Sequence, residues 1–307
     1  MANFLVLQEE LGDRLQLDRN VTVYQNKLKR WINLAQDAIS GRHDWTFLQE
    51  RDMIQTIADK TAGTVTVTDG SAAVTGSGTA FAATDVGKFI QFSGEEDWYE
   101  ILTYVSSTSI TVKPNYGGTS SSTATYTLRT VFYSLDSDVN RILSVKQYNT
   151  PIKLTQIQAP TLDRAQPNIE TTGAPTAYAL FRLDPNGTVD FPSYAKQRQL
   201  QFFPSPNDTY NIEVRYIKHL SDLSDGADIS TVPQQFHDVL LDLAEYYGSK
   251  YLNDPKQSQL LAQAEAGIKR MIQEDCSFGD YFPILQGDGD SGSRFIPFPP
   301  GNFEQPY

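Results

Sequence analysis

The residue types most often used in catalysis or metal binding are few in this chain and lie far apart. There are three histidines, His43, His219 and His237, and a single cysteine, Cys276. A Ser-His-Asp relay would have to be assembled from distant segments, because no local motif supports one. Neither an HxxxH nor a CxxC spacing occurs, and metal sites need such clustering. We therefore interpret the histidines as surface or capping residues. We expect no metal, no cofactor and no enzymatic activity.

Three short patterns begin like known sites but lack essential parts. Residues 76–81 (Gly-Ser-Gly-Thr-Ala-Phe) open like a dinucleotide-binding loop without its third glycine or its helix. Asp288 and Asp290 suggest a calcium loop, but its further acidic ligands and closing glutamate are missing. Residues 95–97 (Glu-Glu-Asp) offer paired carboxylates, which glycosidases use. Consecutive carboxylates at a hairpin tip are usually solvated, so we interpret all three patterns as turns.

Composition limits the classes of protein that remain. A chain of 307 residues with 39% hydrophobic content fits several small cores better than one large core. The net charge of -12, without any basic run, argues against tight nucleic-acid binding by phosphate neutralisation, although DNA can still pass nearby. No apolar run approaches the roughly 20 residues of a membrane helix, and residues 1–10 lack the features of a signal peptide. One cysteine excludes an intrachain disulfide, which favours folding in a reducing cytoplasm.

The spacing of apolar residues predicts helices at both ends of the main body. Residues 3–17 show helical spacing, and a stripe from Tyr24 through Trp31 to Ile39 predicts a second helix. Residues 45–57 then favour a strand. Near the C-terminus, stripes from Phe236 to Tyr251 and from Leu261 to Met271 predict a helical hairpin. We expect these stripes to be buried core.

The middle of the chain is typical of β-structure. Residues 61–128 are rich in Ser, Thr and Gly, and short β-branched runs separated by turn signals predict a small sandwich or barrel. Residues 139–217 are interpreted as antiparallel hairpins, with 139–148 pairing to 152–157, a turn at 184–187, and a clear strand at 209–217. The predicted class is α+β: a helical body with antiparallel hairpins, an inserted all-β module and an extended C-terminal tail.

The tail, residues 277–307, combines aromatic residues with many Gly and Pro, so it cannot bury itself as a helix or central strand. An aromatic segment without its own core usually packs on another surface. We predict that the tail docks on a partner chain, or else on its own subunit. The candidate docking residues are Phe278, Tyr281, Phe282, Phe295, Phe298, Phe303 and Tyr307.

Several segments, in this order, resemble the head-to-tail adaptor proteins of short-tailed bacteriophages. They are residues 31–39 (Trp-Ile-Asn-Leu-Ala-Gln-Asp-Ala-Ile), 44–48 (Asp-Trp-Thr-Phe-Leu), 173–175 (Gly-Ala-Pro) with Tyr178, 200–206 (Leu-Gln-Phe-Phe-Pro-Ser-Pro), the strand that ends at Tyr216, and 232–237 (Val-Pro-Gln-Gln-Phe-His). Residues 63–70, 76–81 and 85–87 are similar to β-modules of virion proteins.

The resemblance covers most of residues 20–275 and implies a virion protein, assembled in the host cytoplasm. It implies a homo-oligomeric ring, usually dodecameric, that joins the portal protein to the tail or nozzle around the channel for genomic double-stranded DNA, which passes without sequence-specific binding. The expected domains are a body (1–60 and 129–276), a β-module (61–128) and the tail (277–307). Two alternatives remain open: a glycan- or fibre-binding function of the β-module, and a cell-wall hydrolase.

Overall fold

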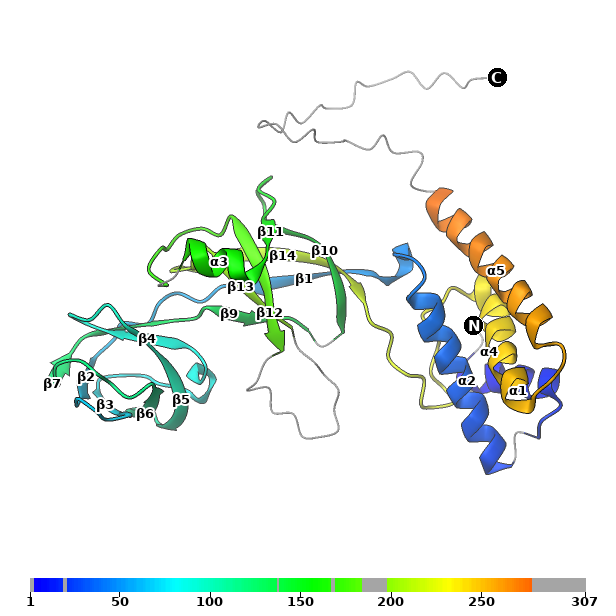
Figure 1. The fold of residues 1–307 in the computed structure, drawn as a ribbon, viewed down its shortest axis with the longest axis horizontal. Coiled ribbons are helices and arrows are strands. Elements are labelled where there is room, and N and C mark those ends of the chain that lie inside the picture. Colours follow the sequence, from blue (N-terminus) through cyan, green and yellow to red (C-terminus); the bar gives the residue numbers. More distant parts are fainter. Residues whose placement is uncertain (1–2, 19–20, 137, 167–168, 184–197, 278–307) are drawn as a thin grey trace, which may run out of the picture.

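The computed structural model describes the whole chain except residues 1–2, 19–20, 137, 167–168, 184–197 and 278–307. It is an elongated α+β molecule (Figure 1), as the sequence predicts. Helices form one end, two layered sheets form the middle, and a curled sheet forms the other end. Each of the three regions contains its own cluster of buried hydrophobic residues.

The helical end consists of four helices whose apolar stripes meet in one core. They are α1 (Phe4–Leu15), α2 (Thr22–Ser40), α4 (His237–Leu252) and α5 (Gln257–Ser277). Each of the predicted stripes contributes to this core: Trp31 is only 6% exposed, and Leu240 and Met271 are fully buried. Tyr251 is an exception, because it lies at the end of α4 and is 56% exposed. The short 3-10 helices η1 (Thr46–Leu48) and η3 (Gln234–Phe236) lead into β1 and α4.

The central sandwich joins two sheets through a shared core. The first has the order β1-β14-β10 and the second β11-β12-β13-β9. The strands are β1 (Gln49–Gln55), β9 (Phe132–Ser134), β10 (Val139–Gln147), β11 (Thr155–Ile157), β12 (Ala177–Leu183), β13 (Arg198–Phe203) and β14 (Asn211–Lys218). Ile212, Val214 and Tyr216 of β14 face this core, as their alternation predicts. The other face of the β1-β14-β10 sheet is the open face.

Three details of the sandwich differ from the sequence prediction. The hairpin between 139–148 and 152–157 forms only near its turn, because β10 pairs along its length with β14. The chain then crosses to the second sheet, where β11 runs parallel to β12. A short helix, α3 (Ala159–Ala165), occupies a stretch with no clear periodicity. The predicted turn at 184–187 lies outside the described residues.

The β-module is one seven-stranded antiparallel sheet curled into a half-barrel, with the order β7-β2-β3-β6-β5-β4-β8. Its elements are β2 (Thr64–Val67), β3 (Ala73–Ser77), η2 (Ala83–Asp85), β4 (Phe89–Phe92), β5 (Trp98–Ser106), β6 (Ser109–Lys113), β7 (Ser121–Ala124) and β8 (Tyr126–Arg129). The two outermost strands, β7 and β8, are separated by Thr125 alone, so one stretch of chain forms both edges. The curl follows from this connection, because the edges must approach one another.

The junction between the β-module and the sandwich is fixed by charged side chains. Lys60 exchanges two backbone hydrogen bonds with Leu128, which brings the entering and leaving chains together. The ammonium of Lys60 lies 2.8–2.9 Å from both carboxylate oxygens of the fully buried Asp85. Arg129 pairs with Asp59 at 2.6 Å and also donates to the carbonyl oxygen of Ile169. The two connections are therefore held against each other.

Candidate functional site

The predicted docking residues of the tail lie outside the described part of the chain, so the structure does not place them. They are Phe278, Tyr281, Phe282, Phe295, Phe298, Phe303 and Tyr307. The same holds for Asp288 and Asp290. What the structure does place is the last described turn of α5, from which the tail continues.

Asp275 fixes that turn against the connection between α2 and β1. Its carboxylate accepts hydrogen bonds from the backbone N–H of Thr46 at 3.2 Å and from the Thr46 hydroxyl. It also lies 3.2 Å from Nε2 of His43. A largely apolar hollow of about 390 Å³ adjoins these contacts, lined by Trp45, Thr46, Phe47, Pro233, Gln235, Phe236, Glu274 and Asp275. The tail therefore begins beside a surface that an aromatic side chain can fill.

His219 and His237 make hydrogen-bond contacts with backbone carbonyl oxygens. The interpretation of His237 as a surface or capping residue is wrong: it is 8% exposed, and its Nε2 lies 3.0 Å from the carbonyl oxygen of Val232. The backbone N–H of His219 donates to the carbonyl oxygen of Asp138 at 2.6 Å. In the portion of the chain that the structure describes, no group of three or more His, Cys, Asp or Glu side chains could hold a metal ion.

The acidic run and the glycine-rich run of the β-module fasten loops. Glu95 accepts hydrogen bonds from the backbone N–H of Thr119 at 3.2 Å and from the Tyr116 hydroxyl at 3.3 Å. Within residues 76–81, the Thr79 hydroxyl donates to the carbonyl oxygen of Ser107, and Phe81 is buried. Residues 95–97 lie in the connection between β4 and β5, as predicted. In the glycine-rich run the prediction of a turn is wrong for Gly76 and Ser77, which end β3 and pair with β2, and only residues 78–81 lie outside the strands.

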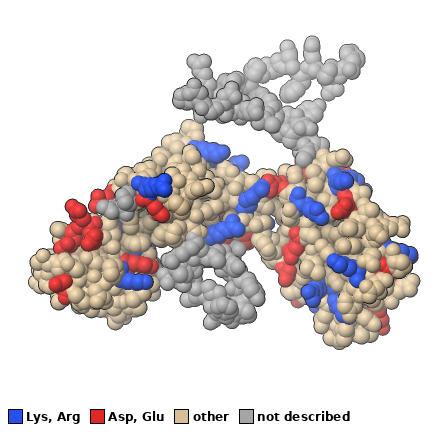
Figure 2. Space-filling model, in the orientation of Figure 1, with Lys and Arg blue, Asp and Glu red and all other residues tan. Residues whose placement is uncertain are grey.

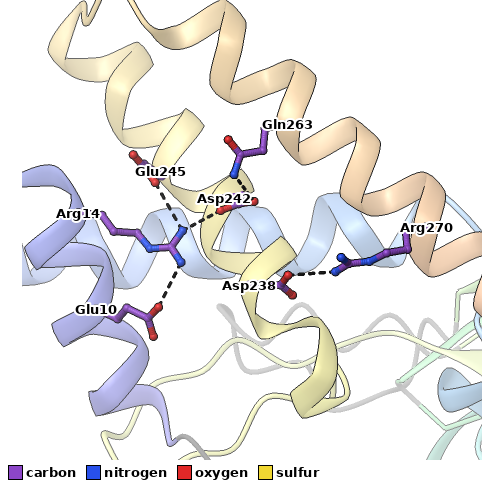
Figure 3. Close-up of polar contacts among 7 residues, drawn as sticks. All are labelled: Glu10, Arg14, Asp238, Asp242, Glu245, Gln263 and Arg270. Atoms are coloured by element: carbon purple, nitrogen blue, oxygen red, sulfur yellow. Dashed lines mark hydrogen bonds and ion pairs between the residues drawn. The ribbon is translucent and has the colours of Figure 1, made fainter.

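The helical end is tied together by a polar network between α1, α4 and α5 (Figure 3). Arg14 of α1 pairs with Asp242 of α4 at 2.7 Å, and the same carboxylate accepts a hydrogen bond from Gln263 of α5 at 3.0 Å. Arg270 of α5 pairs with Asp238 of α4 at 3.0 Å. Arg14 also contacts Glu10 and Glu245. Because the network lies around the packed core of the helical end and links three of its helices, we assign it to stability.

The open face carries a different arrangement, centred on Glu213 of β14. Only 2% of this side chain is exposed, although it points away from the sandwich core. Lys146 lies 3.3 Å away, Arg215 3.2 Å and Arg51 3.9 Å, so three cations surround one carboxylate. Burial alone would raise the pKa of Glu213, but hydrogen bonds from Arg215 and Lys146 hold it below its usual value. Three positive charges therefore surround a single negative charge.

No helix in the described residues is both long and apolar enough to cross a lipid bilayer. The comparison with protein families decides the class: residues 93–280, more than half of the chain, match the model of the SU10 adaptor protein family.

The chain belongs to the SU10 adaptor family. It is therefore a structural adaptor protein of a bacteriophage, and its place is the virion. No curated protein matches the chain. The matched segment begins in the β-module at residue 93 and continues through the sandwich and the helices α4 and α5 of the adaptor. Residues 1–92, which include α1, α2 and β1, lie outside the match.

Sequence reasoning missed the open face of the adaptor. Its cations come from positions 51, 141, 146, 153 and 215, which form no run in the sequence. These cations could have been grouped only from the pairing of β14 with β1 and β10, because alternate residues of paired strands lie on the same face of the sheet. The strand at 209–217 was predicted, but its neighbours in the sheet were not.

Proposed function

We propose that this adaptor forms a ring between the portal protein and the tail of a short-tailed phage, around the channel through which genomic DNA passes. The single observation that carries the proposal is the family match across the sandwich and the α4–α5 hairpin. The resemblance supports a ring of twelve copies, assembled in the host cytoplasm before incorporation into the virion. The proposed partners are the portal protein, a tail or nozzle protein, and tail fibres.

Within this proposal the chain has three parts with different tasks. The body, residues 1–60 and 129–276, forms the ring. The β-module, residues 61–128, points toward a neighbour or a fibre. The tail, residues 277–307, anchors its aromatic side chains on the portal or on an adjacent subunit. The apolar hollow beside the end of α5 supports an arm at this position, because an arm needs a preformed apolar surface to offset its ordering entropy.

Electron microscopy of the adaptor, alone and mixed with its portal protein, tests the ring. We expect closed rings with cyclic symmetry that stack on the portal ring. If the adaptor stays monomeric with the portal present at micromolar concentration, the ring proposal is wrong.

Deletion of residues 280–307 tests the tail separately. We expect the truncated adaptor to fold and melt like the full chain but to lose its binding to the portal ring. If truncation lowers the melting temperature while assembly survives, the tail packs on its own subunit instead. A full-length variant with Phe278, Tyr281 and Phe282 replaced by Ser removes the first anchors without shortening the chain. It should weaken binding to the portal ring in the same direction as the truncation.

A further inference from the structure

Five cations lie on the open face of the β1-β14-β10 sheet. Strand pairing places them there: Arg51 is directly opposite Arg215, Lys146 is opposite Glu213, and Arg141 is opposite Ile217. Lys153 follows β10 and forms an isolated antiparallel bridge with Lys146. Directly opposite residues point to the same side of a sheet, so the five cations share one surface.

This arrangement contains two like-charged cross-strand pairs, Arg51 with Arg215 and Lys146 with Lys153. Like charges directly opposite one another destabilise a sheet. Sequences that violate such a local rule usually do so at functional positions. The open face is therefore a place where stability is reduced in favour of another property.

Compensation by acidic side chains on this surface is incomplete. Glu213 offsets part of the charge of Arg51, Lys146 and Arg215, and Asp44 pairs with Arg141. Among the residues that the structure describes, Lys153 forms no ion pair. Five cations against two carboxylates leave three net positive charges. The guanidinium-bearing side chains remain accessible, with 62% of Arg51, 58% of Arg215 and 57% of Arg141 exposed.

The positive surface continues toward the helical end into a hollow of about 550 Å³. Arg141 and Ile217 line both the open face and this hollow. Arg42, His43 and Arg198 line it as well, together with the single carboxylate of Asp44. On the face drawn in Figure 2, basic side chains lie over the central part and the helical end, and acidic ones, also present there, are densest over the β-module. The open face is thus locally positive, although the chain as a whole has a net charge of -12.

We propose that the open face binds the sugar-phosphate backbone of duplex DNA, by charge and without reading sequence. Protein-protein interfaces have cores depleted of charge and rich in aromatic residues, whereas interfaces with DNA are strongly positive. The centre of the open face is charged, and arginine, with its planar fork of donors, suits phosphate. The proposal rests on the proposed function in one respect: a DNA channel provides the duplex.

The affinity of a single copy is low, because the rest of the chain repels phosphate. Sequence-independent binding at physiological salt has a Kd of about 10⁻⁴–10⁻⁶ M in general, and three net charges place this face at the weak end. Release of about three counterions gives a slope of about -2.7 in log K against log salt. The affinity then falls about 40-fold between about 50 and 200 mM salt. Weak contact of this kind lets a duplex slide.

Fluorescence anisotropy with two duplexes of equal length and unrelated sequence, titrated with the full-length adaptor over this salt range, tests the proposal. We expect equal affinities for the two sequences and the slope given above. The double variant Arg51→Gln with Lys153→Gln keeps Arg215 and Lys146 on Glu213, so it should fold. It should make the slope shallower by about 1.8, because about two phosphate contacts are lost.

Two further variants make the test specific to this face. Lys250→Gln with Lys269→Gln removes the same charge from exposed positions of α4 and α5, and it should leave the slope unchanged. Glu213→Gln removes the compensating anion, so binding should become tighter and the slope steeper by about 0.9. A slope that changes equally in both double variants, or no binding at low salt, would overturn the proposal.

Ring assembly is measured on the same variants without DNA, which separates this inference from the proposed function. If rings form normally and only DNA binding is absent, the inference fails and the adaptor function stands. If Arg51→Gln with Lys153→Gln abolishes ring formation while DNA binding is unaffected, the open face binds a second copy of the chain. That outcome also overturns the proposal.

Discussion

The junction of the β-module and the open face of the central sandwich use the same charged side chains in opposite ways. At the junction, Asp85 is fully buried and held by Lys60 and Lys88, and Arg129 is only 8% exposed beside Asp59. On the open face, Arg51 and Arg215 are more than half exposed and stand directly opposite each other beside Glu213. Burial and pairing, rather than residue type, distinguish the two regions.

The difference has an energetic consequence. Removing one partner of a buried pair leaves an uncompensated charge or unpaired donors in a poorly solvated place, whereas an exposed cation loses little when its partner is removed. The junction should therefore determine stability, and the open face should determine binding.

Arg129→Ala should have the largest effect on stability. The guanidinium of Arg129 pairs with Asp59, donates to the carbonyl oxygen of Ile169, and lies 4.8 Å from the ring centre of Trp98. Losing these contacts leaves the Asp59 carboxylate, only 15% exposed, without its cation, so we expect a loss of about 3–5 kcal/mol in the free energy of unfolding. Urea denaturation followed by circular dichroism measures it. A loss below about 1 kcal/mol would show that the junction tolerates separation.

Asp85→Asn should cost about 3 kcal/mol, because the buried amide cannot balance the two ammonium groups that it faces. The expected loss is smaller than for Arg129→Ala, since Lys60 is 35% exposed and can turn toward water. Asp69→Asn, a change of an exposed carboxylate in the same module, is the matched control and should leave the unfolding curve unchanged. Equal losses in the two variants would contradict the special role of Asp85.

Acid should weaken the β-module through the same residue. Burial would raise the pKa of Asp85, but hydrogen bonds from Lys60 and Lys88 and the charge of Lys88 bring it below its ordinary value. A lowered pKa in the folded state stabilises the fold above the unfolded pKa of about 3.9, and this contribution is lost as the pH falls further. Near-ultraviolet circular dichroism from about pH 5 downward should show this loss in the native chain. In Asp85→Asn the part due to Asp85 should be absent.

Excision of the β-module should affect the helical end little. The buried clusters of the two regions share no residue, so replacing 61–128 with a short Gly/Ser linker should retain the helical signal and its melting temperature. The helical end should therefore fold without the β-module, although ion pairs hold the module firmly against the sandwich. An insoluble product, or a lost far-ultraviolet helical signal, would show that the sandwich needs the module.

Arg51→Gln should have the smallest effect on stability, within about 0.5 kcal/mol. The side chain is 62% exposed, its contact with Glu213 is 3.9 Å long, and its removal relieves the repulsion by Arg215. Thermal unfolding at low and at moderate salt measures the change. A loss comparable to that of Arg129→Ala would mean that the open face is a structural cluster, and the contrast with the junction would disappear.

Much of the fold follows from local patterns in the sequence. The stripe from Tyr24 to Ile39 and the alternation of Ile212, Val214 and Tyr216 indicate which side chains are buried, because helices and strands have fixed periods. The β-branched runs of the module indicate strands for the same reason. Strands without such a run, β7 and β8, and the short helix α3 escape this reasoning. The tail residues remain a prediction from composition.

The α+β class, the helical core stripes and the resemblance to phage adaptors can be derived from the sequence, since they depend on near neighbours and on the order of motifs. Which charges lie together depends instead on how distant strands pair. Arg51, Lys146 and Arg215 are separated by up to 164 positions in the chain, yet they surround one carboxylate because β14 pairs with both β1 and β10. Strand order is set by long-range packing, and no local period encodes it. For that reason an acidic sequence without a basic run folds into a molecule with a positive face.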